Sequence, residues 1–264
     1  MTCRERLSSA FQPHNQVGAP HEPLPGYQAD GESREQFVRQ LFNRTAASYN
    51  RLNAAFSLGT GQRYRRRALL SAGLKLGDRV LDVAVGTGLV AREACIITGQ
   101  PRSVIGLDVS EGMLAQARRL HSIGLVQARA EAIPLGDATV DFVSIGYALR
   151  HVADLERVFS ELLRVLKPGG RLLIIEITPP RSRIGRNMLK VYLGRVVPWL
   201  SRILGAGNEQ TLMRYYWDTI EACAPPDAIL AALRNVGFID VHCQTELGIF
   251  RSYLGRREPI EIAK

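Results

Sequence analysis

The residues whose types and spacing best suit ligand binding lie in the stretch 80–91, which reads VLDVAVGTGLVA. A short apolar run carries the carboxylate of Asp82 and then breaks into the glycine turn Gly86 to Gly88 before a helical pattern resumes. Glycine has no Cβ and tolerates positive φ, so such a turn lets the backbone approach a ligand closely. The turn fits the pattern G-x-G-x-x-A, and Asp108 follows Gly88 by 20 residues. This spacing predicts a nucleotide-binding site, and by itself it fits several cofactor classes.

Two features distinguish this turn from a typical NAD site. Asp82 lies inside the first strand, where a carboxylate could hold the glycine turn or, through water, a cationic amino-acid group. No basic residue follows within the turn, so the loop is poorly equipped for a pyrophosphate. NAD(P) binding is therefore the second interpretation of the turn.

Four motifs in sequence order resemble those of class I S-adenosylmethionine-dependent methyltransferases. They read DVAVGTG from residue 82, GLDVSEGML from residue 106, AEAIPL from residue 130 and LKPGG from residue 166. The resemblance implies that Asp82 and the backbone of Gly86 and Gly88 hold the methionine portion of the cofactor, with Thr87 in the same turn. It further implies that Asp108 accepts hydrogen bonds from the ribose hydroxyls. Met113 would pack on the adenine ring, and the backbone of Ala130 would contact the adenine edge.

One position departs from this family. Many relatives place Asp or Asn just before the Ala-Glu pair, where it bonds the adenine amino group, whereas this chain has Arg129. Arginine has no hydrogen-bond acceptor, so we expect either that Arg129 points to solvent or that other groups hold adenine.

A narrower resemblance lies outside the cofactor motifs and covers residues 35 to 255. Residues 42–53, FNRTAASYNRLN, resemble the F-x-x-I-A-x-x-Y-D-x-x-N segment of the UbiE/COQ5 quinone C-methyltransferases. Residues 142–152, FVSIGYALRHV, resemble the end of that family's fourth strand, and the late segment at 248–250 fits loosely. Three positions differ from the family text: Asn50, Gly146 and His151. Gly146 remains a candidate cofactor contact, and the departures leave the substrate open.

The chemistry expected of this family assigns roles to four side chains. A sulfonium methyl group needs only an in-line nucleophile at near-attack distance, and a phenol carbon becomes one when the adjacent hydroxyl loses its proton. A neutral His151 at the rim of the site could take that proton near pH 7. Arg150 could stabilise the phenolate, while Tyr49 and Tyr147 orient the ring.

The composition of the chain limits the other functional classes. Among 264 residues, 34 Lys and Arg face 25 Asp and Glu, for a net charge of +9, which favours an anionic ligand or surface. The four cysteines are scattered without metal spacing, so we expect neither a disulfide framework nor a metal site, and a cytoplasmic location. The chain has no apolar run of about 18 residues and no signal-like start.

The hydropathy pattern predicts an α/β fold. Strands are expected at 80–84, 103–108, 124–128, 140–145 and 171–177, with helices at 89–98, 112–121 and 155–166 and a tight turn at 167–170. This alternation indicates a Rossmann-like class I methyltransferase fold with helices on both faces of a mostly parallel, seven-stranded sheet. The last two strands, 238–243 and 248–253, are too close for a crossover helix and should form an antiparallel hairpin.

The expected organisation is a disordered extension at 1–34 and a methyltransferase domain at 35–264. Helices within 35–75 should cover the site, and the arginines of the helix starting at Gln62 are expected on a solvated face. Residues 179–222 predict a helical insertion or lid. Residues 178–208 contain no acidic residue and interleave cations with apolar side chains, which is typical of helices resting on anionic lipid. A lid with solvated arginines explains 181–204 equally well.

Three functions follow from this reading. The first is C-methylation of a prenylated benzoquinol or naphthoquinol, as in ubiquinone and menaquinone biosynthesis, with peripheral contact to the inner membrane face through 181–204. The second is methylation of a soluble aromatic or polyketide product. The third is a non-catalytic binding protein that retains the cofactor fold. The basic clusters lack a base-reading motif, so no nucleic-acid partner is expected. A homodimer is left open.

Overall fold

The computed structural model describes residues 19–21, 33–57, 59–120, 122–180, 182–203 and 210–260. The extension predicted at 1–34 lies almost entirely outside this part. The strands are β1 (Val80–Val83), β2 (Val104–Asp108), β3 (Gly124–Gln127), β4 (Val140–Gly146), β5 (Leu166–Ile177), β6 (Ile239–Glu246) and β7 (Phe250–Arg256). The helices before β5 are α1 (Arg34–Thr45), α2 (Tyr49–Ser57), α3 (Gly61–Ser71), α4 (Leu89–Thr98), α5 (Glu111–Leu120) and α6 (Leu155–Val165). Those after β5 are α7 (Arg183–Val191), α8 (Val197–Ile203), α9 (Gln210–Ala222) and α10 (Pro226–Val236). Two 3₁₀ turns, η1 (Pro101–Ser103) and η2 (Leu149–His151), and a π-helical turn, η3 (Tyr192–Val196), complete the list.

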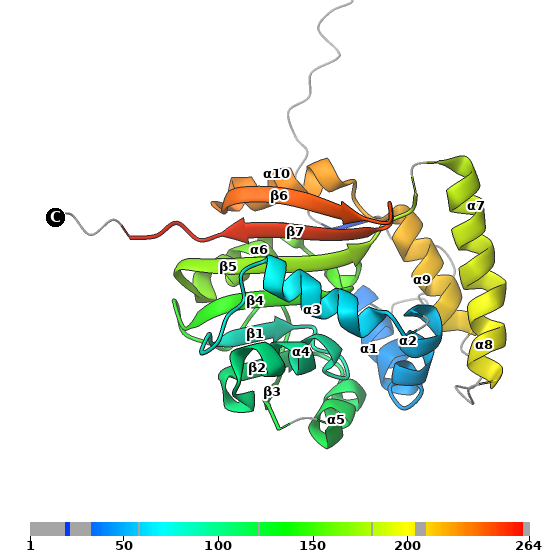
Figure 1. Cartoon of the computed structure of the whole chain (residues 1–264), viewed down its shortest axis with the longest axis horizontal. Coiled ribbons are helices and arrows are strands. Elements are labelled where there is room, and N and C mark those ends of the chain that lie inside the picture. The colour runs from blue at the N-terminus through cyan, green and yellow to red at the C-terminus, as the bar shows by residue number, and fades with distance from the viewer. Residues whose placement is uncertain are drawn as a thin grey trace, which may run out of the picture.

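The seven strands form one sheet in the order β3-β2-β1-β4-β5-β7-β6 (Figure 1). Strands β1 to β5 pair in parallel, and β7 pairs antiparallel with both β5 and β6. The predicted seven-stranded, mostly parallel sheet with a C-terminal antiparallel hairpin is therefore confirmed. Strand β1 is buried along its whole length and β4 at five of its seven positions, because helices cover both faces.

Helix ends follow local sequence signals. Ser33 begins α1 with a capping box, in which its hydroxyl accepts from the Gln36 amide and the Gln36 side chain accepts from the Ser33 amide. Pro226 opens α10, where its missing N–H is harmless, and Gly237 ends that helix at φ 111°. These caps fix where each helix meets the sheet.

Three apolar clusters hold the layers together. One packs α6 and α10 on one face of the sheet, and a second packs α3 and α4 on the other. The third joins α1, α2, α9 and the π turn η3 beyond the carboxyl ends of the parallel strands. Figure 1 shows this third group, together with α7 and α8, gathered at one end of the sheet. Within the described ranges, no helix is long and apolar enough to cross a bilayer.

The tight turn predicted at 167–170 is wrong in detail. Strand β5 begins at Leu166, and β4 advances from Val140 to Phe142 while β5 advances from Leu166 to Arg171. The glycine-rich segment is therefore a bulge inside the strand, and Gly169 adopts φ 77° there. Hydrogen bonds to the chain after β7 hold this bulge, because the Gly169 amide donates to the Arg257 carbonyl and the Arg257 amide donates to the Gly170 carbonyl.

Candidate functional site

Three adjoining cavities lie beyond the carboxyl ends of β1, β2 and β4, and Tyr49 and Tyr147 line all three. The sheet-edge cavity, of about 120 Å³, follows the ends of β1, β2 and β4. The turn cavity, of about 30 Å³, surrounds Asp82 and the glycine turn. The aromatic cavity, of about 250 Å³, lies between α2, α3, α9 and the β6–β7 turn. Such a chain of cavities at the carboxyl edge is where open α/β sheets bind ligands.

Asp82 is the buried carboxylate of the turn cavity. Its side chain is 1% exposed, and its Oδ1 atom accepts a 2.6 Å hydrogen bond from the Ser144 hydroxyl. Its Oδ2 atom is buried without a hydrogen-bond partner among the described residues. Burial raises the pKa of Asp82 to about 7, with the Ser144 bond acting in the opposite direction. A half-satisfied buried carboxylate favours a ligand that carries a positive charge.

Asp108 ends β2 at the sheet-edge cavity. Its Oδ2 accepts from the Gly86 amide at 2.8 Å, and its Oδ1 accepts from the Ser110 amide at 2.8 Å. Burial raises its pKa although these amides oppose the shift. A carboxylate oxygen has two lone pairs, so each oxygen keeps one acceptor site for a ligand hydroxyl.

The predicted adenine contacts Met113 and Ala130 both line the sheet-edge cavity. Met113 is 2% exposed. Arg129 also lines this cavity, and its guanidinium lies 2.7 Å from Glu35 and 3.7 Å from Glu131. Arg129 thus ties α1 to the loop after β3. This arrangement resolves the departure seen in the sequence, because the arginine is held by carboxylates at the cavity wall.

The glycines of the site serve different purposes. Gly86 adopts φ 56° and Gly88 φ 88°, so both need the left-handed backbone that glycine reaches without strain. A Cβ on Gly86 would meet no atom within 4 Å, which leaves the turn open to a ligand. A Cβ on Gly146 would lie 2.7 Å from Val90 Cγ2, so glycine is required there by the close approach of α4.

The N-terminal helices attach to the cofactor turns through two asparagines, Asn43 and Asn50, to which sequence reasoning gave no structural role. The Asn43 side chain accepts from the Ser110 hydroxyl at 2.7 Å and from the Gly112 amide at 2.9 Å. Asn50 accepts from the Thr87 hydroxyl at 2.5 Å. Asn50 is one of the departures from the family text, and its bond to Thr87 shows that an amide can serve in this position.

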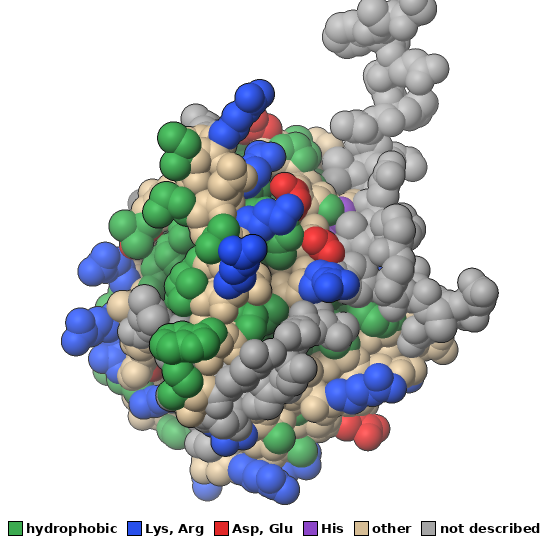
Figure 2. Space-filling view, turned by 90° about the vertical axis from the view of Figure 1, so that its right-hand side faces the viewer, with side chains coloured by type: hydrophobic (Ala, Val, Ile, Leu, Met, Phe, Trp, Pro, Cys, Tyr) green, Lys and Arg blue, Asp and Glu red, His purple; other side chains and the backbone are tan. Residues whose placement is uncertain are grey.

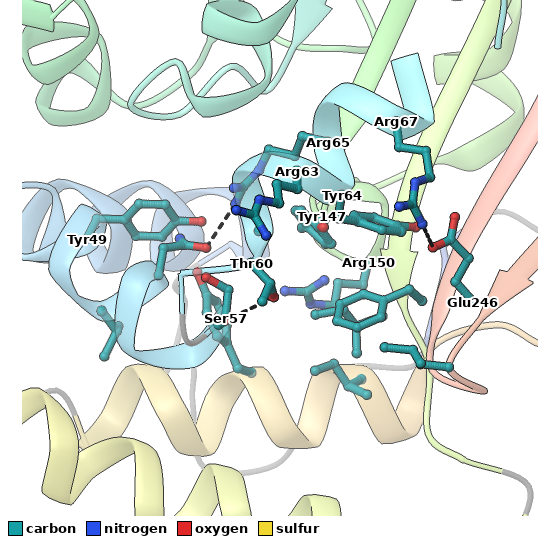
Figure 3. Close-up of a pocket in the computed structure, with 18 of the residues that line it drawn as sticks. Tyr49, Ser57, Thr60, Arg63, Tyr64, Arg65, Arg67, Tyr147, Arg150 and Glu246 are labelled. Atoms are coloured by element: carbon teal, nitrogen blue, oxygen red, sulfur yellow. Dashed lines mark hydrogen bonds and ion pairs between the residues drawn. The ribbon is translucent and has the colours of Figure 1, made fainter. Parts of the chain in front are cut away.

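The aromatic cavity contains most of the predicted acceptor-side residues. Figure 3 shows Tyr49, Tyr147 and Arg150 around it, together with Arg65 and Tyr64 from α3. Its apolar lining comes from α2, α9, β5 and the β6–β7 hairpin: Leu52, Ile177, Met213, Ile220, Leu247 and Phe250. Leu247 is 88% exposed. The cavity is suited to a flat ring with an apolar substituent.

Arg150 is buried at 3% exposure, and its charge has a close partner. Its Nη1 atom lies 2.6 Å from Glu176 Oε2, and its guanidinium lies 5.1 Å from the centre of the Tyr216 ring. Glu176 also accepts from the Leu149 amide at 2.9 Å. The positive charge expected to stabilise a phenolate is therefore largely offset by a buried carboxylate.

The expectation that the α3 arginines form a solvated face is wrong for Arg65. Its side chain is 7% exposed and lines both the turn cavity and the aromatic cavity. Its Nη2 donates to Asn53 Oδ1 at 3.2 Å, its Nε is buried without a partner, and it joins none of the ion pairs among the described residues. Helical spacing could have predicted this burial, because Arg65 lies on the same face of α3 as the buried residues Gly61, Ala68 and Leu69.

His151 lies at the carboxyl edge of the sheet. It lines the sheet-edge cavity and not the aromatic cavity, and its ring stacks on Tyr215 with 5.3 Å between centroids. Its Nδ1 lies 3.1 Å from the Tyr215 hydroxyl. Burial, and then the nearby Arg150 and Arg34, lower its pKa well below the usual value. A histidine so poorly able to gain a proton is a weak general base.

Comparison with known proteins identifies the lineage of the chain. Residues 30–256 match the model of the ubiE/COQ5 methyltransferase family. A Geobacter sulfurreducens protein named ubiquinone/menaquinone biosynthesis C-methyltransferase UbiE is 36% identical over 83% of this chain and 88% of its own length. A Symbiobacterium thermophilum demethylmenaquinone methyltransferase is 34% identical over 89% of this chain and 99% of its own.

Solved structures share the fold at lower identity. A SAM-dependent methyltransferase from Thermotoga maritima, described as a possible histamine N-methyltransferase, has a TM-score of 0.60 and 20% identity over 84% of this chain and all of its own. The [4+2]-cyclase SpnF has a TM-score of 0.64 and 17% identity over 92% of this chain and 99% of its own. At these identities the likeness is one of fold, and a methyltransferase and a cyclase that share it carry out unlike reactions.

Proposed function

Because the chain belongs to the ubiE/COQ5 methyltransferase family and is an S-adenosylmethionine-dependent methyltransferase, we propose that it methylates a ring carbon of a prenylated benzoquinol or naphthoquinol. The names of relatives at 34% and 36% identity support this acceptor class. The observation that carries the proposal is the aromatic cavity, which meets the cofactor side of the site at Tyr49 and Tyr147.

The residues present fit S-adenosylmethionine. In the proposed arrangement, the unpartnered Oδ2 of Asp82 receives the amino group of the methionine portion, and Asp108 accepts from the ribose hydroxyls. Met113 and Ala130 flank adenine. When bound, this cofactor supplies an electrophilic methyl group on a sulfonium.

Arg65 completes the proposed charge pattern around the methionine portion. It shares the turn cavity with Asp82, and its charge contributes to lowering the Asp82 pKa against the larger effect of burial. A carboxylate and an unpaired guanidinium on one small cavity complement the two charges of an amino-acid zwitterion. We therefore assign the α-carboxylate to Arg65.

The acceptor side works mainly through positioning. Tyr49 and Tyr147 line both cavities, and we propose that they orient the acceptor ring. Arg150 donates a hydrogen bond to the acceptor oxygen, and Glu176 fixes its guanidinium. The lowered pKa of His151 argues against the role of base, and the proposal gives it a supporting role beside Tyr215. The three described cysteines are free thiols, which supports the proposed cytoplasmic location.

The test is incubation with methyl-labelled cofactor and two acceptor sets, demethylated prenyl quinols and ring-matched phenols without a tail. Carbon-methylated prenyl quinol, identified by mass spectrometry and NMR, is the expected product. Label on oxygen, or label only in the tail-free phenols, would replace this proposal with the soluble aromatic alternative. No label in either set, with no cofactor binding by calorimetry, would favour a non-catalytic binding protein.

A further inference from the structure

Among the described residues, a run of exposed large apolar side chains lies on α7, the π turn η3 and α8, outside the three cavities. Six side chains make up this run, and we call them the outer stripe: Ile184, Met188, Val191, Val196, Trp199 and Ile203. They are 40% to 76% exposed, and they make up six of the eleven most exposed large hydrophobic residues among those described. Figure 2 shows apolar and basic side chains gathered on this side of the molecule.

The π turn keeps the outer stripe on one face. Its members are separated by three or four residues, except across the step from Val191 to Val196, which spans five. That step coincides with η3, where the Val197 amide donates to the Tyr192 carbonyl five residues back. Such a turn accommodates one extra residue, so the stripe continues in phase from α7 into α8. A π turn at this point preserves an apolar face that a regular α-helix would rotate away.

The inner face of the same segment is already packed. Leu193 and Val197 are fully buried in the cluster that contains Met213 and Trp217 of α9. By contrast, no residue of α7 is buried. The outer stripe is therefore a second apolar face, which the packing of the described residues leaves uncovered.

Cations accompany the outer stripe without acidic neighbours on the same segment. Arg183, Arg186, Lys190 and Arg195 are exposed, and residues 178–208 contain no Asp or Glu. Arg186 lies 3.9 Å from Glu221 of α9. An exposed apolar stripe between cations fits the boundary between headgroups and acyl chains of an anionic bilayer.

We propose that the outer stripe docks on the surface of an anionic lipid bilayer, with Trp199 and Met188 inserted and the flanking cations at the headgroups. Charge complementarity selects this occupant over a second copy, because a face-to-face dimer of a +9 chain would place these cations against their own kind. The docking face is the outer side of the helical layer whose inner helix, α9, lines the aromatic cavity through Met213, Tyr216 and Ile220. The proposal stands independently of the acceptor.

The experiment is flotation of the full chain with phosphatidylcholine vesicles, with and without phosphatidylglycerol, in the absence of cofactor and acceptor. Wild type should float only with the anionic vesicles. Met188→Ser with Trp199→Ser should lower the partition coefficient by at least about tenfold. Lys190→Gln should lower it by about fivefold, and rising salt should weaken binding.

Matched controls come from exposed residues away from the stripe. Leu76, 77% exposed ahead of β1, offers Leu76→Ser, and the exposed Arg119 of α5 offers Arg119→Gln. Both should float like wild type, and unchanged thermal melting should show that every variant is folded. The proposal is overturned if wild type does not float, or if the controls lose binding as much as the stripe variants. A stable dimer by light scattering that Trp199→Ser dissociates would assign the stripe to a second copy instead.

Discussion

Substitution of Asp82 by asparagine should stabilise the empty protein while weakening its hold on the cofactor. Asp82 is fully buried, and its pKa is raised from 3.8 to about 7 by burial. A raised carboxyl pKa means that the fold disfavours the ionised form. The resulting penalty is absent below pH 3.8, grows as the pH rises to about 7, and is constant above that.

The size of the effect follows from the pKa values. The displacement from 3.8 to about 7 corresponds to about 4 kcal/mol at pH 8. Asparagine keeps an oxygen for the Ser144 hydroxyl, but its NH₂ group enters the place of the unpartnered Oδ2 and costs about 1–3 kcal/mol if it finds no acceptor. The net gain is about 2 kcal/mol, or about 4–8 °C in Tm for a domain of this size.

Differential scanning calorimetry at pH 8 and pH 4, without cofactor, measures this gain. It should be present at pH 8 and turn into a loss of about 1–3 kcal/mol at pH 4, because Asp82 is protonated there in the wild type and only the cost of the unpartnered NH₂ group remains. Asp141→Asn is the control with opposite sign. Burial acts to raise the pKa of Asp141, but hydrogen bonds from Lys167 and the Arg79 amide lower it overall. Loss of the Asp141 carboxylate should therefore destabilise the protein slightly at pH 8.

Isothermal titration with S-adenosylhomocysteine measures the cofactor side. Loss of a charge-assisted bond of about 1.5–3 kcal/mol should weaken binding by roughly 10- to 100-fold in Asp82→Asn. Wild-type affinity should fall as the pH drops below about 7, and the variant should lack this dependence. A variant that melts lower than wild type at pH 8, or that binds as tightly, would refute the reasoning.

Three further changes test the neighbouring contacts. Arg65→Met should weaken binding of S-adenosylhomocysteine by roughly 10- to 100-fold and leave its decarboxylated analogue unchanged by titration; equal loss for both ligands, or loss of turnover alone, would remove the carboxylate assignment. Glu176→Gln leaves the buried charge of Arg150 uncompensated and should lower the free energy of unfolding by about 3–5 kcal/mol, measured by urea denaturation. An unchanged urea midpoint would contradict this. Gly146→Ala should lower both Tm and cofactor affinity, because its Cβ would lie 2.7 Å from Val90 Cγ2; adding Val90→Ala should restore them, and failure of that rescue would locate the strain elsewhere.

The cofactor half of the site could be predicted from the sequence because it is built from local turns. Gly86 and Asp108 follow or end adjacent strands, whose carboxyl ends a parallel sheet necessarily brings together, and Met113 lies in the first turn of the helix after β2. The hairpin was predictable for the same reason, because two strands joined by a short connection can pair only antiparallel. Each of these features depends on chain connectivity over a few residues.

The acceptor half could not be predicted to the same depth because it joins distant segments. Arg150 and Glu176 form their ion pair only when η2 and the end of β5 lie side by side, and this pairing changes what Arg150 can do. The altered pKa of His151 likewise depends on the burial created by surrounding aromatic residues and on Arg34 from α1. Burial and charge pairing are properties of the assembled environment.

The sequence by itself thus determined the sheet, its hairpin and the cofactor turn with Asp82, since hydrophobic periodicity and glycine spacing act over short distances. Only the tertiary structure decided that Arg65 is buried between two cavities while Arg150 is neutralised by Glu176. Two arginines can look alike in a sequence, but the nearest carboxylate decides which guanidinium keeps an uncompensated charge for a ligand.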